Sequence, residues 1–249
     1  MAIALTFGNL TIDGCTEMAW TNSYRVTEHR FPRRAGSIAP RVPAKDSKHL
    51  SLICEVWKDT EAELLTYFES LNAKLDAGRD RLVVRDNGRF INVVPVDPDV
   101  SYKANSVPAL HAFYSLKFLA DDPYWYAPTS LSDSQTVGAV NVKNWTITNA
   151  GGARTPMVME ITRTAAGGDQ ANVLITNSTT GLYMKWTGTL TNGVKLFFDA
   201  VNKRVTVGGG NGLIDFSGTF LDLEPGANHL QYDGPQNVTI ATTWMERWS

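Results

Sequence analysis

Residues 128–249 are a succession of short β-forming runs separated by turn residues, and no apolar stripe at helical spacing interrupts them. The predicted strands are Val137–Val142, Trp145–Asn149, Met157–Arg163, Asn172–Thr176, Gly181–Lys185, Val194–Asp199, Arg204–Val207, Leu213–Phe216, Gly218–Leu223, His229–Tyr232 and Asn237–Trp248. The turn signals between them include Asn149-Ala-Gly-Gly, Gly167-Gly168-Asp169, Thr191-Asn192-Gly193, Pro225-Gly226 and Asp233-Gly234-Pro235. This spacing predicts an antiparallel β-sandwich or jelly roll.

The stretch Asp121-Asp122-Pro123-Tyr124-Trp125-Tyr126-Ala127-Pro128 marks a change in composition. Residues 1–127 carry 15 Lys/Arg and 16 Asp/Glu, whereas residues 128–249 carry 8 and 9. The strand Ala112–Ala120 before it is mostly apolar on both faces, which predicts a strand covered on both sides. We therefore predict two domains, 1–127 and 128–249, with the three aromatic residues filling a seam between them. An ordinary core strand ending in a turn remains the alternative.

The first domain is predicted to be β-sandwich-like with one α-helix. Residues 3–30 contain two or three strands, and His49–Trp57 contains another. Thr60-x-x-Glu63 has the form of a capping box and predicts a helix over residues 60–77, ended by Gly78. One apolar stripe recurs at helical spacing and predicts that the helix packs on a sheet: Leu64, Leu65, Phe68, Leu71 and Leu75.

A β-hairpin is predicted over Arg81–Val94, because Asn87-Gly88 suits a two-residue type I′ turn. That turn would pair three sets of residues on one face: Asp86 with Arg89, Val84 with Ile91, and Leu82 with Val93. The apolar pairs of this face are expected to pack on the helix.

The segment Tyr24–Lys48 is basic and rich in proline. It holds Arg25, Arg30, Arg33, Arg34, Arg41, Lys45 and Lys48 against Glu28 and Asp46, together with Pro32, Pro40 and Pro43. Prolines at this density exclude a long helix or a central strand, so we predict a projecting basic loop or arm. Its candidate interface anchors are Arg30, Phe31, Arg33, Arg34 and Arg41, directed at an acidic surface of a neighbouring subunit. A solvated surface loop is the alternative.

Composition argues against several function classes. The net charge of −2 argues against a general nucleic-acid binder, and no apolar run is long enough to span a membrane. The N-terminus lacks a basic region and a long apolar run, so it is expected to form a first strand and not a signal peptide. Cys15 and Cys54 are expected to be free thiols in a reducing cytoplasm, and a disulfide between them remains an alternative.

Motifs for catalysis or ligand binding are absent from the sequence. His29, His49, His111 and His229 are scattered, no Gly-x-Ser-x-Gly occurs, and the glycine run 208–212 lacks the Gly-Lys-Ser/Thr of a phosphate-binding loop. We therefore predict no enzyme activity, no catalytic residue, no metal site and no cofactor. A glycan-cleaving enzyme whose carboxylates meet only in the fold stays an alternative.

A carbohydrate-binding module is the second function considered, with Trp145, Tyr183 and Trp186 as a stacking platform for sugars. The competing interpretation places these aromatic residues in the sandwich core, and the β-forming runs around them favour it.

Several segments occur in an order that resembles one protein family. They are Asp121–Tyr126, Asn149-Ala-Gly-Gly-Ala-Arg-Thr-Pro156, Phe220-Leu-Asp-Leu-Glu-Pro-Gly-Ala-Asn-His-Leu230 and the closing Trp244-Met-Glu-Arg-Trp248. Over its whole length the chain resembles the distal tail proteins of long-tailed, siphovirus-type bacteriophages.

This resemblance implies a structural virion protein of the tail tip or baseplate, made in the host cytoplasm. It implies a homo-hexameric ring formed by the N-terminal domains and a galectin-like C-terminal domain on the outside. The implied partners are the tail tube protein, the baseplate hub or tail-associated protein, and receptor-binding or side-fibre proteins. Catalysis, specific nucleic-acid binding and membrane binding are not implied, and a galectin-like shape does not by itself imply sugar binding.

Overall fold

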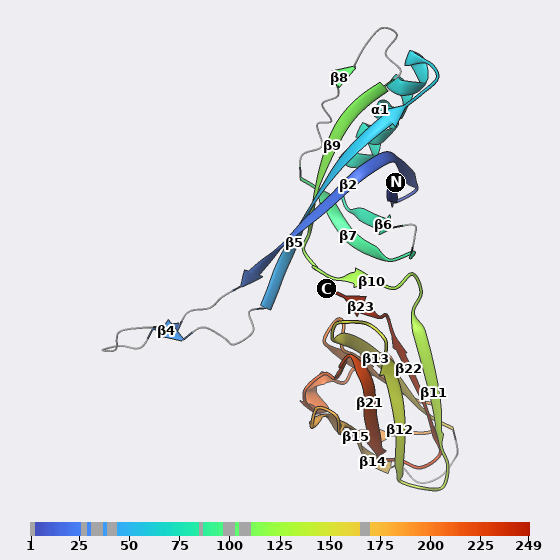
Figure 1. The fold of residues 1–249 in the computed structure, drawn as a ribbon. Helices are drawn as coiled ribbons and strands as arrows, with labels where there is room; N and C mark the ends of the chain where they lie inside the picture. The colour runs from blue at the N-terminus through green and yellow to red at the C-terminus, as the bar shows by residue number, and fades with distance from the viewer. Residues whose placement is uncertain are drawn as a thin grey trace. The chain divides into compact units, whose positions relative to one another are not determined.

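The computed structural model describes residues 3–25, 29–30, 37–38, 44–84, 87–96, 103–104, 111–164 and 170–249. The chain divides into two compact units, Met1–Pro128 and Thr129–Ser249. The prediction of a mainly β protein is confirmed, and the described residues contain one α-helix (Figure 1).

The sheet of the first unit closes into a barrel. Its strands are β1 (Ile3–Phe7), β2 (Leu10–Arg25), β5 (Ala44–Trp57), β6 (Asp80–Val84), β7 (Phe90–Pro95) and β9 (His111–Ala120). They follow the order β7-β6-β1-β2-β5-β9, and β7 also pairs with β9, which completes the closure. Short strands extend or flank it: β8 (Lys103–Ala104) on β9, β10 (Trp125–Tyr126) on β7, and the pair β3 (His29–Arg30) and β4 (Ser37–Ile38).

Strand β9 shows how the barrel uses its alternating side chains. Tyr114, Leu116 and Phe118 are buried, whereas Phe113, Ser115 and Lys117, which alternate with them, are exposed. The prediction that this strand is covered on both sides is therefore wrong, because one face of a barrel strand points inward and the other outward. The inward side chains form a continuous core: Leu5, Phe7, Ile12, Leu50, Leu52, Val56, Leu82, Ile91, Val93, Leu116 and Phe118.

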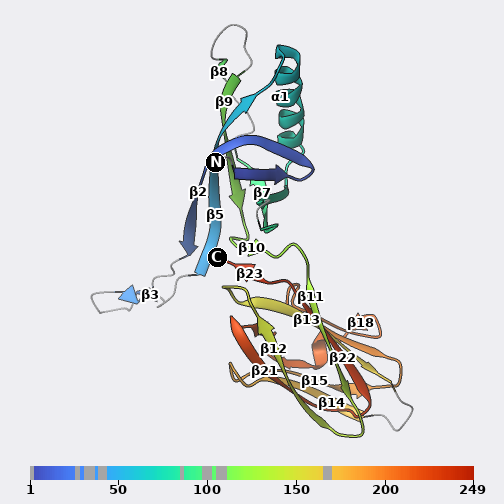
Figure 2. The same cartoon turned by 45° about the vertical axis from the view of Figure 1, so that its right-hand side comes forward.

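Helix α1 (Glu61–Asp76) lies as a separate layer beside the strands, as Figure 2 shows. The predicted capping box is present, with Glu63 N donating to Thr60 Oγ1 and Thr60 N donating to Glu63 Oε2, each at 3.2 Å. Gly78 follows the helix with φ +85°, as expected of a residue that ends a helix in the left-handed region.

The buried face of α1 differs from the prediction at two positions. Leu65 is exposed, and Tyr67 joins Leu64, Phe68, Leu71 and Leu75 on the face that packs on the barrel. The tyrosine ring gives this face apolar area, and its hydroxyl reaches a polar group of the barrel.

The β6–β7 hairpin has the predicted face but not the predicted register. Leu82 pairs with Ile91, and Val84 N donates to Arg89 O at 2.9 Å, so the connection is two residues longer than a type I′ turn at Asn87-Gly88 would give. Because side chains alternate with a period of two, this slip of two residues leaves Leu82, Ile91 and Val93 in the core.

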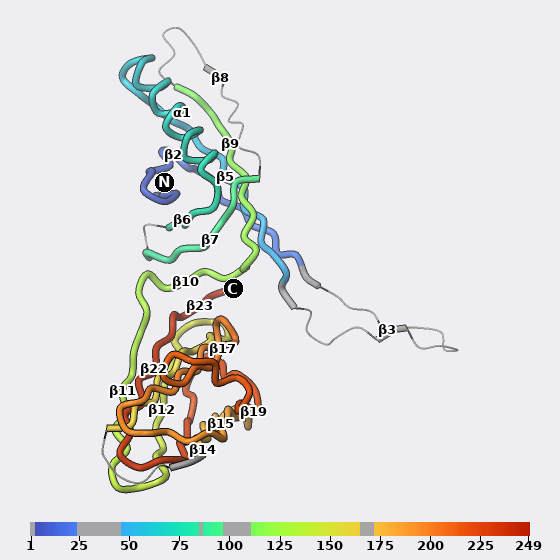
Figure 3. Tube along the Cα trace, turned by 180° about the vertical axis from the view of Figure 1, so that it is seen from behind, coloured from blue at the N-terminus to red at the C-terminus, as the bar shows by residue number. Residues whose placement is uncertain are grey.

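Strands β2 and β5 form a long two-stranded ribbon, which Figure 3 shows from behind. Their pairing continues to Tyr24↔Lys45 and Arg25↔Ala44, so the predicted loop from Tyr24 to Lys48 is wrong at both ends. Lys48 belongs to the barrel, where it is fully buried with its Nζ 5.8 Å from the centre of the Trp125 ring.

Cys15 and Cys54 lie opposite each other on β2 and β5 and are joined by a disulfide. The expectation of free thiols is therefore wrong. The two residues are separated by 39 positions, and only the register of the β2–β5 pair brings them together.

The stretch that follows β9, residues 121–128, belongs to the first unit and packs against other residues of it. Arg79 donates to both carboxylate oxygens of Asp121 at 2.9 Å, and the Tyr126 ring stacks on Phe90 with centroids 5.6 Å apart. That its aromatic residues fill a seam between domains stays a prediction.

The second unit consists of two antiparallel sheets and confirms the predicted β-sandwich. The first sheet contains β11 (Leu131–Val137), β22 (Val238–Trp244), β13 (Thr155–Arg163), β16 (Lys195–Asp199), β17 (Arg204–Val207) and β18 (Gly210–Asn211) in this order, with β20 (Asp222–Leu223) paired to β13. The second contains β12 (Val142–Asn149), β21 (Gly226–Asp233), β14 (Gln170–Asn177), β15 (Leu182–Leu190) and β19 (Phe216–Gly218) in this order. Strand β23 (Arg247–Trp248) follows β22.

The sandwich core lies between these two sheets. It is built from the inward residues of both: Ile147, Met157, Met159, Ile161, Val173, Ile175, Met184, Trp186, Leu196, Phe198, Leu230, Tyr232 and Ile240. Each such side chain contributes about 1.5–3 kcal/mol through burial.

Two predicted strands of this unit are wrong. Val137–Val142 spans the turn between β11 and β12, and residues 213–215 form the 3₁₀ turn η1 (Leu213–Asp215). Val137 is buried at the end of β11, but Val140 and Val142 are exposed, as are Leu213 and Ile214, the latter at 88%. The prediction failed because it relied on residue types that favour strands and did not consider whether their side chains are buried.

Candidate interaction surfaces

The structure describes only one of the five predicted interface anchors. Arg30 lies in β3, whose register is His29↔Ile38 and Arg30↔Ser37. Phe31, Arg33, Arg34 and Arg41 lie outside the described residues. Their role at an interface stays a prediction.

An apolar surface occupies the outer face of β5 and β9, and we call Ile53, Trp57 and Phe113 the outer apolar patch. These side chains are 48%, 65% and 44% exposed. The strand register places them together, because Ile53 and Trp57 are on β5 and Phe113 pairs with Glu55 between them. Adjacent apolar side chains exposed on one sheet face are typical of an interaction site.

Polar groups fix the orientation of the largest member of this patch. The Trp57 ring stacks on His111 with centroids 3.8 Å apart and an interplanar angle of 6°. Glu55 Oε1 accepts from Trp57 Nε1 at 3.1 Å and lies 2.6 Å from His111 Nε2. The indole is therefore held in one orientation while its outer face meets solvent, which lowers the entropy lost when a partner covers it.

A buried tyrosine pair connects α1 to the barrel. The hydroxyls of Tyr67 and Tyr114 are 2.6 Å apart, and Tyr114 donates to Asp13 O at 2.7 Å. Asp13 N donates to Tyr67 Oη at 3.0 Å, and Lys58 Nζ pairs with the Asp13 carboxylate at 2.7 Å. Burial raises the pKa of Tyr67 and of Tyr114, so both hydroxyls stay protonated at neutral pH. The network is suited to holding the helix in place.

The arrangement of the acids does not support paired-carboxylate chemistry at Asp121 and Asp122. Asp121 is held by Arg79, whose hydrogen bonds lower the pKa of the carboxyl, and Asp122 accepts from Tyr126 Oη. Among the described residues there is no group of three or more His, Cys, Asp or Glu side chains that would suit a metal ion. No described helix combines the length and the apolar composition that crossing a membrane requires.

The proposed stacking platform of three aromatic residues is wrong for two of them. Trp145 and Trp186 are buried in the sandwich, which confirms the core interpretation for both. Tyr183 is 45% exposed on the outer face of β15.

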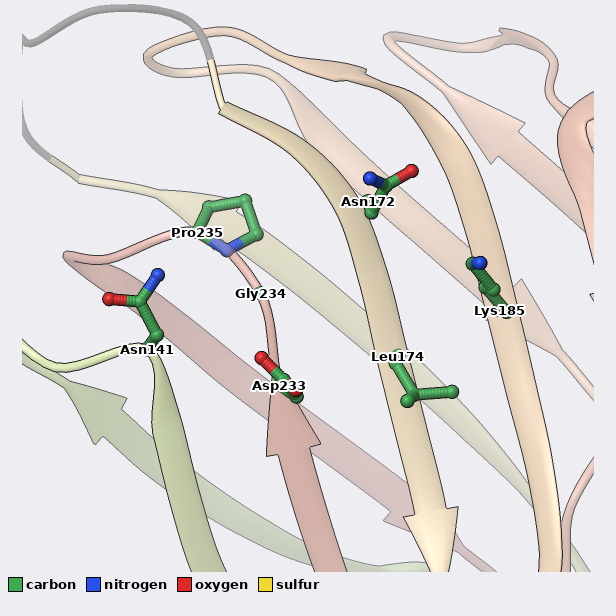
Figure 4. Close-up of a pocket in the computed structure, with 7 residues that line it drawn as sticks. All are labelled: Asn141, Asn172, Leu174, Lys185, Asp233, Gly234 and Pro235. Atoms are coloured by element: carbon green, nitrogen blue, oxygen red, sulfur yellow. The ribbon is translucent and has the colours of Figure 1, made fainter.

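A polar hollow of about 580 Å³ opens on the same outer face (Figure 4). It is lined by Asn141, Asn172, Leu174, Lys185, Asp233, Gly234 and Pro235. The sequence analysis missed it because its lining comes from four separate segments whose proximity depends on the pairing of β21, β14 and β15.

Comparisons with known proteins connect this fold to phage tails. Residues 150–248 match the family described as siphovirus-type tail component, C-terminal domain. This match covers most of the second unit. This finding confirms the resemblance to distal tail proteins for the C-terminal part of the chain.

The whole chain is similar in fold to a solved phage protein. It matches the SPP1 Dit (gp 19.1) protein, described as a paradigm of the hub adsorption apparatus in phages infecting Gram-positive bacteria, with a TM-score of 0.72. The match covers 100% of both chains at 14% sequence identity, so it shows a shared fold. The phage P2 baseplate in its activated conformation with Ca gives a TM-score of 0.42 at 9% identity, over 96% of this chain and 90% of that one. No curated protein matches the chain in sequence.

Proposed function

We propose that the chain is a ring subunit of a phage tail tip or baseplate that connects the tail tube to the hub and to host-recognition proteins. The match of residues 150–248 to the siphovirus-type tail component family carries this proposal. The shared fold with SPP1 Dit over the full length supports it, because both units of the chain then have a counterpart in one tail protein.

The two units take different roles in this proposal. Residues 1–127 form a homo-hexameric ring that contacts the tail tube protein on one side and the hub or tail-associated protein on the other. Residues 128–249 form a galectin-like domain on the outside, where receptor-binding or side-fibre proteins attach. The protein is made in the host cytoplasm, is located in the virion and has no catalytic role.

The surface of the first unit supports the ring. A closed ring needs head-to-tail contacts, in which one surface of each copy meets a different surface of the next. The outer apolar patch provides one such surface, with Trp57 and Phe113 as large side chains of the kind that dominate interfaces. The basic segment between β2 and β5, with Arg30, Phe31, Arg33, Arg34 and Arg41, is proposed as a second contact.

The mass of the full-length protein in solution tests the proposal. Multi-angle light scattering at micromolar concentration should give a hexamer. Replacing Trp57→Ser together with Phe113→Ser should shift the mass toward the monomer, whereas Ile214→Ser, which removes a more exposed apolar side chain of the other unit, should not. A wild-type protein that is a monomer at every salt and protein concentration would count against the ring.

A further inference from the structure

A row of polar side chains crosses the outer face of the second sheet of the sandwich. Strand pairing aligns Asp233, Leu174 and Lys185 side by side on β21, β14 and β15, with the exposed Val142 of β12 next to Asp233. The next row along the strands contains Gln231, Thr176 and Tyr183, with Asn144 on β12, and the third contains Thr146 and His229. We call these nine side chains the polar strip: Asn144, Thr146, Leu174, Thr176, Tyr183, Lys185, His229, Gln231 and Asp233.

Alternation along each strand separates the polar strip from the core. Val173, Ile175, Met184, Trp186, Leu230 and Tyr232 are the buried residues that alternate with it. All nine members of the polar strip are exposed or partly exposed. The strip therefore faces solvent over three consecutive rows, a length of roughly 14 Å at about 3.4 Å per residue.

The chemistry of the polar strip favours a neutral, polyhydroxylated ligand. Its amide, hydroxyl and imidazole groups include both donors and acceptors, and sugar hydroxyls also act as both. Its single cation, Lys185, and its single anion, Asp233, flank Leu174, so the strip has no excess charge to attract nucleic acid or an anionic surface. Tyr183 is its one exposed aromatic ring, which suits stacking against the apolar face of a sugar.

The polar hollow lies at one end of the polar strip. Figure 4 shows Asp233, Asn141 and Pro235 on one side of it and Asn172 and Lys185 on the other, with Leu174 between them. Its volume of about 580 Å³ falls within the range of small-molecule sites. One sugar ring placed there would have an aliphatic side chain beneath it and hydrogen-bonding groups around its edge.

Hydrogen bonds hold the wall of the hollow in place. Gly234 N donates to Asn141 O at 3.0 Å, Gln236 Nε2 donates to Asn141 Oδ1 at 2.8 Å, and Tyr232 Oη donates to Pro235 O at 2.8 Å. A Cβ at Gly234 would lie 2.8 Å from Tyr232 Oη, so the glycine allows the turn to pack this closely. Because this wall is already ordered, less conformational entropy is lost when a ligand binds.

A smaller hollow of about 250 Å³ marks the other end of the polar strip. Asn144, Thr146, Ser178 and His229 line it together with the edges of two core residues. Thr146 Oγ1 and His229 Nδ1 are 3.0 Å apart, which fixes the orientation of the imidazole. The strip thus has a hollow at each end, and Tyr183 lies in the middle row on β15, two strands away from His229 on β21.

We propose that the polar strip binds a short neutral oligosaccharide. One sugar ring occupies the polar hollow, where Asp233 accepts hydrogen bonds from its hydroxyls and Lys185 and Asn172 donate to them. The next ring stacks on Tyr183, which follows Lys185 by one row on β15. This site differs from the platform of Trp145, Tyr183 and Trp186 predicted from sequence, and it does not depend on ring formation.

Isothermal titration calorimetry of the full-length protein with maltotriose, galactotriose and chitotriose tests the proposal. Concentrations up to roughly 10 mM are needed, because shallow sites of this kind bind in the millimolar range. At least one trisaccharide should bind, and Asp233→Asn and Tyr183→Ala should each weaken it by roughly tenfold, the effect of losing about 1.4 kcal/mol. Tyr183→Phe keeps the ring and should retain most of the affinity.

Asp133→Asn on β11, in the opposite sheet, is the matched control and should bind like the wild type. Circular dichroism identifies any variant that fails to fold. If Asp233→Asn does not fold, Tyr183→Ala still tests the proposal, because the Tyr183 side chain is exposed. The proposal is overturned if none of the three sugars binds, or if the control loses as much affinity as the strip variants. A sugar that binds Tyr183→Ala and Asp233→Asn as tightly as the wild type lies elsewhere, which also overturns it.

Discussion

The barrel and the sandwich have similar interiors but different exteriors. Both units bury aliphatic and aromatic side chains on one face of their strands. On the other face, the barrel presents Ile53, Trp57 and Phe113 on neighbouring strands, whereas the sandwich presents the polar strip. The exposed apolar residues of the sandwich include turn positions such as Val140, Val201 and Ile214.

The outer apolar patch is therefore suited to a permanent protein contact. The polar strip is suited to hydration and to reversible binding of a ligand. Apolar area on a sheet face is stabilised when a partner covers it, while hydroxyl and amide groups lose little by staying hydrated. The following predictions test whether the two units differ as proposed, from the largest expected effect to the smallest.

The largest effect is expected from removing a core ring in either unit. Phe118→Ala in the barrel and Phe198→Ala in the sandwich should each cost about 3–5 kcal/mol, because both rings are fully buried. If the units fold independently, differential scanning calorimetry should show two transitions, with each substitution lowering only one. Ser115→Ala, on the exposed face of the same strand as Phe118, is the control and should cost less than about 0.5 kcal/mol. A single transition that both core substitutions lower together would contradict independent domains, as would a fragment 129–249 that is unfolded when expressed alone.

Removing the Cys15–Cys54 disulfide should have the second-largest effect on stability. The bond closes a loop between positions 39 apart, and loss of such a cross-link typically costs about 2–4 kcal/mol. Cys15→Ser with Cys54→Ser should therefore lower the midpoint of chemical unfolding of the barrel and leave the sandwich unchanged. Wild-type protein under a reducing agent should reproduce this result, and no change in either case would show that the cross-link does not stabilise the native protein.

The tyrosine pair predicts a smaller effect that depends on pH. Tyr114→Phe should cost about 1–3 kcal/mol, because it leaves the partly buried Asp13 carbonyl and the buried Tyr67 hydroxyl without this partner. Since burial raises the pKa of Tyr114 in the folded protein, the unfolded chain loses its tyrosine proton first, above a pH of about 10. Wild-type stability should therefore be retained below that pH and fall as the pH rises beyond it, and the fall should be less steep for Tyr114→Phe. Urea unfolding at neutral and alkaline pH measures both slopes, with Tyr183→Phe as the exposed control.

The smallest effect on stability is expected in the basic segment. Arg33→Ala with Arg34→Ala should leave the melting temperature nearly unchanged, because exposed arginine pairs contribute only about 0–1 kcal/mol each. The same double variant should weaken assembly when light scattering is repeated at low and high salt. Wild-type assembly at both salt concentrations would show that these arginines are solvated and that the contact lies elsewhere.

Local patterns predicted the parts of the fold that depend on neighbouring residues. The capping box at Thr60 and Glu63 placed α1 to within one residue at each end. The hairpin was assigned the correct face with a register two residues off, because alternation fixes the face while the length of the connection fixes the register.

Contacts between distant segments could not be predicted in this way. Closure of the barrel depends on β7 pairing with β9, and the disulfide depends on the register of β2 with β5. Both require pairings that no short pattern specifies. The polar hollow has the same origin, since Asn141, Asn172 and Asp233 approach only when the sheet has formed.

The outer apolar patch could have been found from the sequence. Strand β5 alternates buried Leu52, Cys54 and Val56 with Ile53, Glu55 and Trp57. Ile53 and Trp57 occupy the positions that alternate with the core residues, where polar side chains are expected. Two large apolar residues at such positions indicate a surface that a partner covers, so the alternation along this strand was enough to predict the patch.

The position of the disulfide on the β2–β5 ribbon has a mechanical consequence. A force applied to the segment between Arg25 and Ala44 would separate the ribbon pair by pair, beginning at its far end. Separation would stop at Cys15 and Cys54, where a covalent bond crosses the two strands. The chain between them could then extend to roughly 130 Å at about 3.4 Å per residue, and the load would pass through the covalent bond. The disulfide thereby sets a limit to how far β2 and β5 can be pulled apart, and the barrel pairs of β5 with β9 from Lys48 to Ile53 lie on the side of the bond that the force reaches first.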